Sequence, residues 1–291
     1  MNSKKPRIAF CFSWQARTLD KTFSYFQENL FNAAKEQWFE YDIFCVVEDD
    51  EDVDKINLLN PTLIEKIKSS DVEKKINIIL NDVIIKNKKY FNSKYFNFLI
   101  ETVPQQLYKI ERSFFLKDQY KLEKNLQYDM VFRLRYDVIF NYKLKFSTLK
   151  DIFSQGCDIV CNSFWKWPNS YWSIMDLYFI ANDSVKLDNL FSSYAYYYNK
   201  ITSRKFVPIR IIYQILVFFL KILHKQLSND IQDNISKKIC YWNFVPEINL
   251  YKYLIGNKYR IKLLRLNIIL IRKSVIRCYP KHKNIPYEIY L

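Results

Sequence analysis

Glycine and histidine are almost absent from this chain of 291 residues, which contains only two of each. The phosphate-binding loops of Rossmann dehydrogenases and P-loop kinases need several glycines within a few residues. Gly156 and Gly256 are too far apart in the sequence to share such a loop, so both classes are excluded. His224 and His282 show no evident cysteine or carboxylate partner, and we interpret both as structural. So few histidines also leave little to complete a zinc site.

Long hydrophobic segments are missing as well. The longest apolar stretch, residues 209–223, is interrupted by Arg210, Gln214 and Lys221, whereas a membrane span needs roughly 20 apolar residues. The apolar run near the N-terminus is too short for a signal peptide. The sequence therefore predicts a cytoplasmic protein, and its six cysteines are expected to be reduced thiols.

Acidic residues are absent from residues 248–287, which carry ten lysines or arginines, and the whole chain has a formal net charge of +15. Each basic side chain near an anionic membrane surface contributes about 1 kcal/mol to binding. Nucleic acid would attract the same residues by the same Coulomb interaction. The basic C-terminal region, about residues 252–291, therefore predicts an anionic partner.

A strand, a helix and a second strand open the chain. Residues 7–12 form a continuous apolar run, as in a buried parallel strand. Thr18 and Asp20 can cap a helix whose apolar residues recur at helical spacing as far as Trp38, and residues 41–47 form the next strand. This βαβ pattern predicts a ligand crevice at the carboxyl end of the first strand.

The rest of the chain continues the alternation of strands and helices. Residues 54–126 are mostly helical in pattern, and residues 128–140 predict a strand that runs into a charged turn. Further short strands are expected at residues 158–162, 177–181 and 268–272. The pattern predicts an α/β fold in a single domain, residues 1–291, with a helical insertion or lid at about residues 192–228.

The first candidate site is the turn from Ser13 to Arg17, which follows the first strand. The hydroxyl of Ser13 and the amide of Gln15 can hold a uridine or cytidine base. The guanidinium of Arg17 can bind a pyrophosphate through two hydrogen bonds. The alternative is a polar helix entrance in which Arg17 is solvated.

The second candidate site lies at the end of the strand predicted at residues 128–140. Arg133 and Arg135 alternate with apolar residues and therefore share one side of the strand, and Asp137 follows on the turn. Two guanidiniums can neutralise a diphosphate, and the carboxylate can bind the donor's sugar hydroxyls or a divalent metal such as Mg²⁺ or Mn²⁺. The alternative is an Arg–Asp ion pair at the edge of the sheet.

Other acidic residues are weaker candidates. The run from Glu48 to Asp54 contains six acids and can form a metal site, although a solvated loop is the favoured interpretation. Asp176 precedes a predicted strand and can act as the general base for a sugar hydroxyl. Glu247 begins a predicted helix, where a negative charge is favourable, and is the weaker candidate for a base.

Four segments, taken in order, resemble those of bacterial glycosyltransferases encoded in lipopolysaccharide and capsule gene clusters. They are residues 7–18, residues 129–140, residues 173–181, and the region from Pro246 and Glu247 to the strand ending at Arg272. The resemblance spans about residues 7–272. It implies a GT-A-like fold, a Rossmann-like nucleotide-diphospho-sugar transferase domain with a mixed, mainly parallel sheet flanked by helices.

The resemblance also implies roles for individual residues. Ser13, Gln15 and Arg17 would hold the nucleotide. Arg133, Arg135 and Asp137 would meet the diphosphate, the donor sugar and any Mg²⁺ or Mn²⁺. Asp176 and Glu247 would face the acceptor and act in catalysis.

The sequence departs from the family pattern at three points. Trp14 and Ala181 stand where the pattern has glycine, and no DxD motif is present. A tryptophan is expected to deny the turn a positive φ, because its Cβ restricts that region. The missing motif puts metal dependence in doubt.

The function expected is that of a hexosyltransferase-type enzyme. It would transfer sugar from a nucleotide-sugar donor to a cell-surface glycan or lipid-linked acceptor, as a peripheral protein at the inner face of the membrane. Two alternatives remain: a catalytically degenerate glycosyltransferase-like scaffold, and a basic nucleic-acid-binding protein. No nucleic-acid-binding motif is present, and nucleic acid is not the expected partner.

Overall fold

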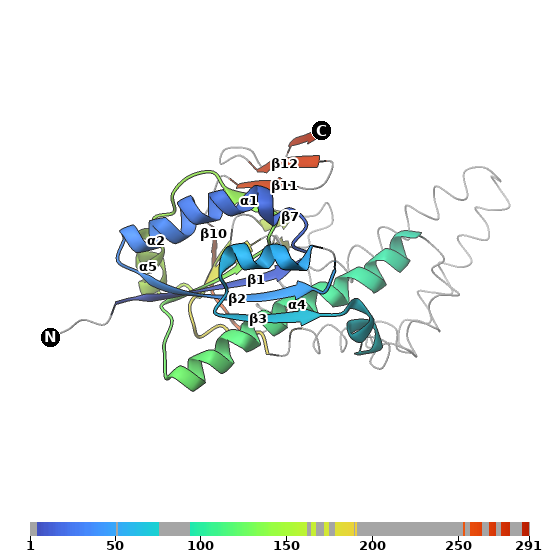
Figure 1. Ribbon diagram of the computed structural model, residues 1–291. Coiled ribbons are helices and arrows are strands. Elements are labelled where there is room, and N and C mark those ends of the chain that lie inside the picture. The colour runs from blue at the N-terminus through green and yellow to red at the C-terminus, as the bar shows by residue number, and fades with distance from the viewer. Residues whose placement is uncertain are drawn as a thin grey trace.

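The computed structural model describes residues 5–50, 52–75, 94–161, 164–166, 172–174, 178–188, 190, 253, 257–263, 268–271, 275–279 and 287–290 (Figure 1). A seven-stranded sheet forms the centre of this part of the chain. Its strands, in spatial order, are β10 (Ile261–Leu263), β6 (Ile159–Cys161), β9 (Tyr178–Ala181), β4 (Met130–Leu134), β1 (Arg7–Trp14), β2 (Glu40–Glu48) and β3 (Leu63–Ile67).

Only β9 runs against the other strands of this sheet. The neighbours β3, β2, β1 and β4 are mutually parallel, β9 pairs antiparallel with both β4 and β6, and β10 is parallel to β6. The α/β fold expected from the sequence, with a mixed and mainly parallel sheet, is therefore confirmed. The strands expected near residues 7–12, 41–47, 158–162 and 177–181 are β1, β2, β6 and β9.

Helices cover both faces of the sheet (Figure 1). One face packs against α1 (Leu19–Phe26), a π-helical turn η1 (Gln27–Asn32), α2 (Ala33–Glu36) and α5 (Phe146–Ser154), whereas the long helix α4 (Lys94–Lys124) packs on the other. Successive residues of β1 alternate between the two cores, with Phe10 and Phe12 toward α1 and Ala9 and Cys11 toward α4. Runs that are apolar on both faces are what a buried parallel strand requires.

A second, antiparallel sheet adjoins the end of β4. It contains β5 (Val138–Phe140), β11 (Ile268–Ile271), β12 (Val275–Tyr279) and β13 (Tyr287–Tyr290), and a separate pair is formed by β7 (Phe164–Lys166) and β8 (Trp172–Ile174). The single strand predicted at residues 128–140 is therefore wrong. The chain leaves the main sheet at Leu134 and enters the second sheet at Val138, so residues 135–137 form the corner between them.

Two more expectations need correction. The segment at residues 54–126 is not mainly helical throughout, because it begins with the 3₁₀ helix η2 (Val53–Leu59) and the edge strand β3. Trp38 does not face the sheet with Phe26, Leu30 and Ala34. The helix ends at Glu36, and Trp38 takes a left-handed φ of 65° that leaves its side chain 73% exposed.

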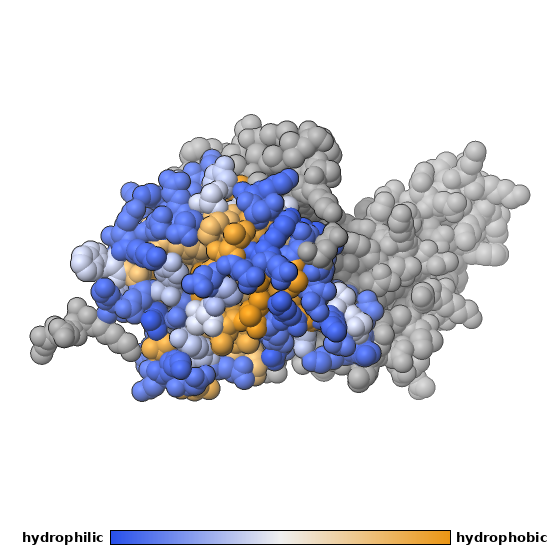
Figure 2. Space-filling model, viewed as in Figure 1, coloured by the Kyte–Doolittle hydropathy of each residue, from blue (hydrophilic) through white to orange (hydrophobic). Residues whose placement is uncertain are grey.

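Hydrophilic residues cover most of the described surface on the face shown in Figure 2, and hydrophobic residues form a band between them. No helix among the described residues combines the length and hydrophobicity needed to cross a membrane. The helical insertion expected at residues 192–228 lies outside the described residues.

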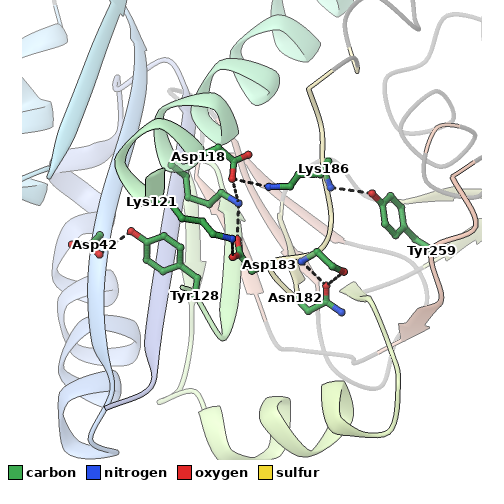
Figure 3. Close-up of polar contacts among 10 residues, drawn as sticks. Asp42, Asp118, Lys121, Tyr128, Asn182, Asp183, Lys186 and Tyr259 are labelled. Atoms are coloured by element: carbon green, nitrogen blue, oxygen red, sulfur yellow. Dashed lines mark hydrogen bonds and ion pairs between the residues drawn. The ribbon is translucent and has the colours of Figure 1, made fainter. Parts of the chain in front are cut away.

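Buried ion pairs fasten α4 to the turn that follows β9 (Figure 3). The Lys117 ammonium is fully buried and lies 2.8 Å from Asp183 and 2.9 Å from Asp118. Lys121 also binds Asp183, and Lys186 binds Asp118 at 2.9 Å. Burial alone would raise the pKa of Asp183, but the two lysines outweigh it and hold that pKa below its usual value.

We expect Asp183→Asn to lower the free energy of unfolding at pH 7 by about 3 kcal/mol, because it removes one partner of a buried charge. The folded-state pKa of Asp183 lies below the unfolded-state value of about 3.9. Its contribution is therefore complete above about pH 5 and is lost as the pH falls through the folded-state pKa. Urea denaturation across this range should show the gap between wild type and variant closing in acid.

The matched control is Asp71→Asn, which breaks the exposed pair with Lys74. An exposed pair contributes little to stability, so this variant should unfold like the wild type at every pH. Equal losses in the two variants would contradict the structural role given to Asp183.

Candidate functional site

The two candidate segments meet at one edge of the sheet. Strands β1 and β4 are adjacent and parallel, with Cys11 opposite Arg133 and Phe12 opposite Leu134. The turn that follows β1 and the corner that follows β4 therefore lie at the same carboxyl edge, where open α/β sheets bind ligands. The end of β2, at Glu48, reaches the same edge beside β1.

Arg135 connects the two segments. Its guanidinium lies 4.2 Å from the centre of the Trp14 ring. It also donates to both oxygens of Asp137, from Nε at 2.9 Å and from Nη2 at 2.6 Å. Arg135 is 3% exposed and Asp137 is 6% exposed. The ion pair considered from the sequence is thus present, and Arg135 also stacks on Trp14 at the carboxyl edge of the sheet.

Trp14 takes a backbone conformation that residues with a Cβ rarely adopt. Its φ is 151°, and holding a residue in such a region costs on the order of 1–3 kcal/mol. The expectation that tryptophan would deny this turn a positive φ was therefore wrong. The contact with Arg135 offsets part of the strain, because a cation over an indole ring contributes about 0.5–2 kcal/mol.

Tyr136 anchors the corner through its ring, its hydroxyl and its carbonyl. Its ring stacks on Phe12 with centroids 5.5 Å apart and planes within 12° of parallel. Its hydroxyl donates to the Val46 carbonyl at 3.2 Å, and its own carbonyl accepts from the Thr22 hydroxyl at 2.6 Å. Complete burial raises the pKa of Tyr136 well above its usual value. These contacts fix the backbone from which Arg135 and Asp137 project.

Gln15 belongs to a third group, which extends to the buried face of α4. Its amide Nε2 donates to Glu48 Oε2 at 2.5 Å, and Lys109 of α4 binds the other oxygen of Glu48. Glu48 is 8% exposed and Lys109 is 3% exposed. Burial opposes ionisation of Glu48, but Lys109 and the hydrogen bond from Gln15 hold its pKa below the usual value. Burial lowers the pKa of Lys109, so its charge depends on Glu48.

Ser13 and Arg17 occupy opposite environments. Ser13 is 1% exposed, and its hydroxyl has no hydrogen-bond partner within the described part of the chain. Arg17 is exposed before α1, as the solvated alternative expected, and among the described residues Lys55 donates to its carbonyl at 3.0 Å. Its guanidinium nevertheless contributes to the low pKa of Glu48.

Arg133 is fully buried within β4, between Cys11 of β1 and Phe179 of β9. Its predicted contact with a diphosphate, like that of Arg135 at 3% exposed, stays a prediction. A guanidinium so placed acts on a ligand at the edge only through its charge. Asp176 and Glu247, the predicted catalytic residues, lie outside the described residues.

The proposed metal site does not fit the donors observed. Both carboxylate oxygens of Asp137 already accept hydrogen bonds from Arg135. Across the described residues, no three histidine, cysteine or acidic side chains come together as a metal would require. A divalent cation at Asp137 would have to share both oxygens with the Arg135 guanidinium, whose positive charge opposes its binding.

Sequence reasoning missed Glu48 and Lys109. Glu48 was grouped with the acidic loop, but it is the last residue of β2 and is buried, while Asp49 is exposed. A signal was present, because Glu48 continues the alternation of Phe44 and Val46 toward α4. Lys109 had no comparable signal, since only the packing of α4 shows which of its lysines face the sheet.

Comparisons with known proteins identify no family for this chain. No protein-family model matches the chain, and no curated protein matches it. Similar solved structures include A197 from STIV, with 10% identity, a TM-score of 0.33, and coverage of 98% of this chain and 93% of that chain. Mouse xyloside xylosyltransferase 1 in its apo form has 10% identity, a TM-score of 0.36, and coverage of 89% and 84%. A nucleoside-diphosphate-sugar pyrophosphorylase from Vibrio cholerae RC9 has 12% identity, a TM-score of 0.34, and coverage of 90% and 94%. TM-scores this low carry no argument about function.

We expect Trp14→Gly to be more stable than Trp14→Ala by about 1 kcal/mol, although both lose the stack on Arg135. Only glycine relieves the strain of a φ of 151°. At exposed Ser24 in α1 the order should reverse, because alanine is favoured over glycine in a helix by about 1 kcal/mol. Thermal and urea denaturation of the four variants measure this, and the same order at both positions would contradict the strain at Trp14.

Proposed function

We propose that the protein is a glycosyltransferase that transfers a sugar from a nucleotide-sugar donor to a glycan or lipid-linked acceptor. The observation that carries the proposal is the meeting of the Ser13–Arg17 turn with Arg135 and Asp137 at the carboxyl ends of two neighbouring parallel strands. Groups suited to a base and groups suited to a diphosphate thus share one edge of the sheet, where open α/β sheets bind ligands.

The catalytic contribution assigned to this edge is electrostatic. When the sugar leaves, negative charge develops on the departing nucleoside diphosphate, and cations held in advance stabilise it without reorganising. Arg135 fits this role, because Asp137 and Trp14 fix its guanidinium. Arg133 adds positive charge from within the sheet. No step is routed through a metal, because the donors of Asp137 do not fit one.

The other parts of the proposal come from the resemblance. Asp176, or Glu247, would remove the proton from the acceptor hydroxyl. The basic C-terminal region would hold the enzyme against the anionic inner face of the membrane, close to a lipid-linked acceptor in a cell-surface glycan pathway.

Isothermal titration with UDP, GDP and CDP sugars tests the proposed site through Arg135→Lys. Lysine keeps the charge but loses the planar fork that binds a diphosphate and stacks on an indole. We expect affinity for the preferred donor to fall about tenfold or more. Titrations with and without Mn²⁺ should agree, because Asp137 is engaged by Arg135.

Arg112→Lys is a closely matched control. Arg112 also stacks on an aromatic ring, Phe115 at 4.2 Å, and also pairs with both oxygens of a carboxylate, Glu65, at 3.1 and 3.0 Å. It lies on α4, away from the carboxyl edge, and its substitution should leave donor affinity unchanged. Donor binding without sugar transfer would identify a degenerate scaffold. Salt-sensitive RNA binding without donor binding would identify a nucleic-acid-binding protein.

A further inference from the structure

A chain of three side chains runs from the interior to the carboxyl edge of the main sheet. Lys109 of α4 binds Oε1 of Glu48, and Oε2 of Glu48 accepts from the amide of Gln15. Lys109 and Glu48 are almost fully buried, whereas Gln15 is partly exposed. Because Trp14 is paired with Val47, Gln15 and Glu48 are the next residues along two neighbouring parallel strands. The chain therefore ends in Gln15, within the Ser13–Arg17 turn proposed to hold the nucleotide.

Glu48 acts on Gln15 as an acceptor only. An ionised carboxylate has no proton to donate, and Lys109 and Gln15 together keep Glu48 ionised against the effect of burial. A glutamine amide can otherwise present either its oxygen or its nitrogen to a ligand. Here Nε2 must turn toward Glu48, so Oε1 is left on the other side of the amide. Gln15 Oε1 accepts no hydrogen bond from the described residues.

We propose that Glu48 and Lys109 are positioning residues that make Gln15 a fixed hydrogen-bond acceptor, so the site selects a nucleobase with an imide N–H. This inference rests on the proposed function and specifies its donor. Uracil, at N3, and guanine, at N1, carry such a donor. Cytosine presents a lone pair at the same ring position, which would face the lone pairs of Gln15 Oε1. The preferred substrate class is a uridine or guanosine diphosphate sugar.

Titration of the full chain with UDP, GDP and CDP measures the preference. In the wild type, UDP or GDP should bind about tenfold or more tightly than CDP, because CDP would leave a polar group of the site unpaired. Whichever of UDP and GDP binds more tightly identifies the preferred base as uracil or guanine. Equal affinities for all three nucleotides would overturn the inference while leaving the proposed function intact. No binding of any of them would overturn the proposed function itself.

Glu48→Gln tests the positioning role. A glutamine at this position both donates and accepts, so the Gln15 amide is free to turn, and the preference should shrink to within about threefold. Its matched control is Glu65→Gln, which alters another strand glutamate paired with a cation of α4, Arg112 at 3.0 Å. The control should keep the full preference. If Glu48→Gln kept the wild-type preference, Glu48 would not be a positioning residue for Gln15.

Gln15→Ala provides a variant that leaves the buried pair in place. Because Gln15 is partly exposed, the protein should fold normally, as judged by circular dichroism and thermal denaturation. The preference should be lost, mainly through weaker binding of UDP or GDP. A role of Glu48 in stability alone would not change the ratio of two nucleotide affinities, so Gln15→Ala with an unchanged ratio would contradict the proposal even if Glu48→Gln failed to fold.

Discussion

The desolvation of three cationic side chains constrains much of this structure. Lys109, Lys117 and Arg135 are each at most 3% exposed, and an unpaired charge so deeply buried costs several kcal/mol. Each is paired with a carboxylate: Lys109 with Glu48 at the end of β2, Lys117 with Asp183 after β9, and Arg135 with Asp137 in the same corner. The first two pairs hold α4 against the sheet, and the third fixes the corner after β4.

The same pairing explains why the candidate site is rigid before any ligand arrives. Arg135 is held by Asp137 and Trp14, and the corner that carries it is anchored by the ring and hydroxyl of Tyr136. The residue with the strained φ, Trp14, is also the one whose indole ring lies over the guanidinium. Strain at a site edge and charges fixed in advance are features that functional sites use to hold groups ready for a ligand.

Local features of the fold were predictable from the sequence, and long-range ones were not. The apolar runs of β1 and β2 predict buried parallel strands, and the polar residues at their ends indicate a ligand site at the carboxyl edge of the sheet. The division of residues 128–140 between two sheets was not predictable, because β5 pairs with β11, which lies far away in the sequence. The sequence indicates the turn after β1 and the segment from Arg133 to Asp137 as two separate sites. Only the order of the strands brings Trp14 and Arg135 into contact. Lys109 was missed for the same reason, since its partner Glu48 comes from another element.

The account is tested most directly by a crystal structure of the full chain with the nucleoside diphosphate that it binds most tightly. We expect the base beside Gln15, with its imide N–H directed at Oε1, and the diphosphate within hydrogen-bonding distance of Arg135. A nucleotide bound elsewhere, for example along the basic C-terminal region, without contact to Arg135, would contradict the claim that the carboxyl edge of β1 and β4 is the functional site.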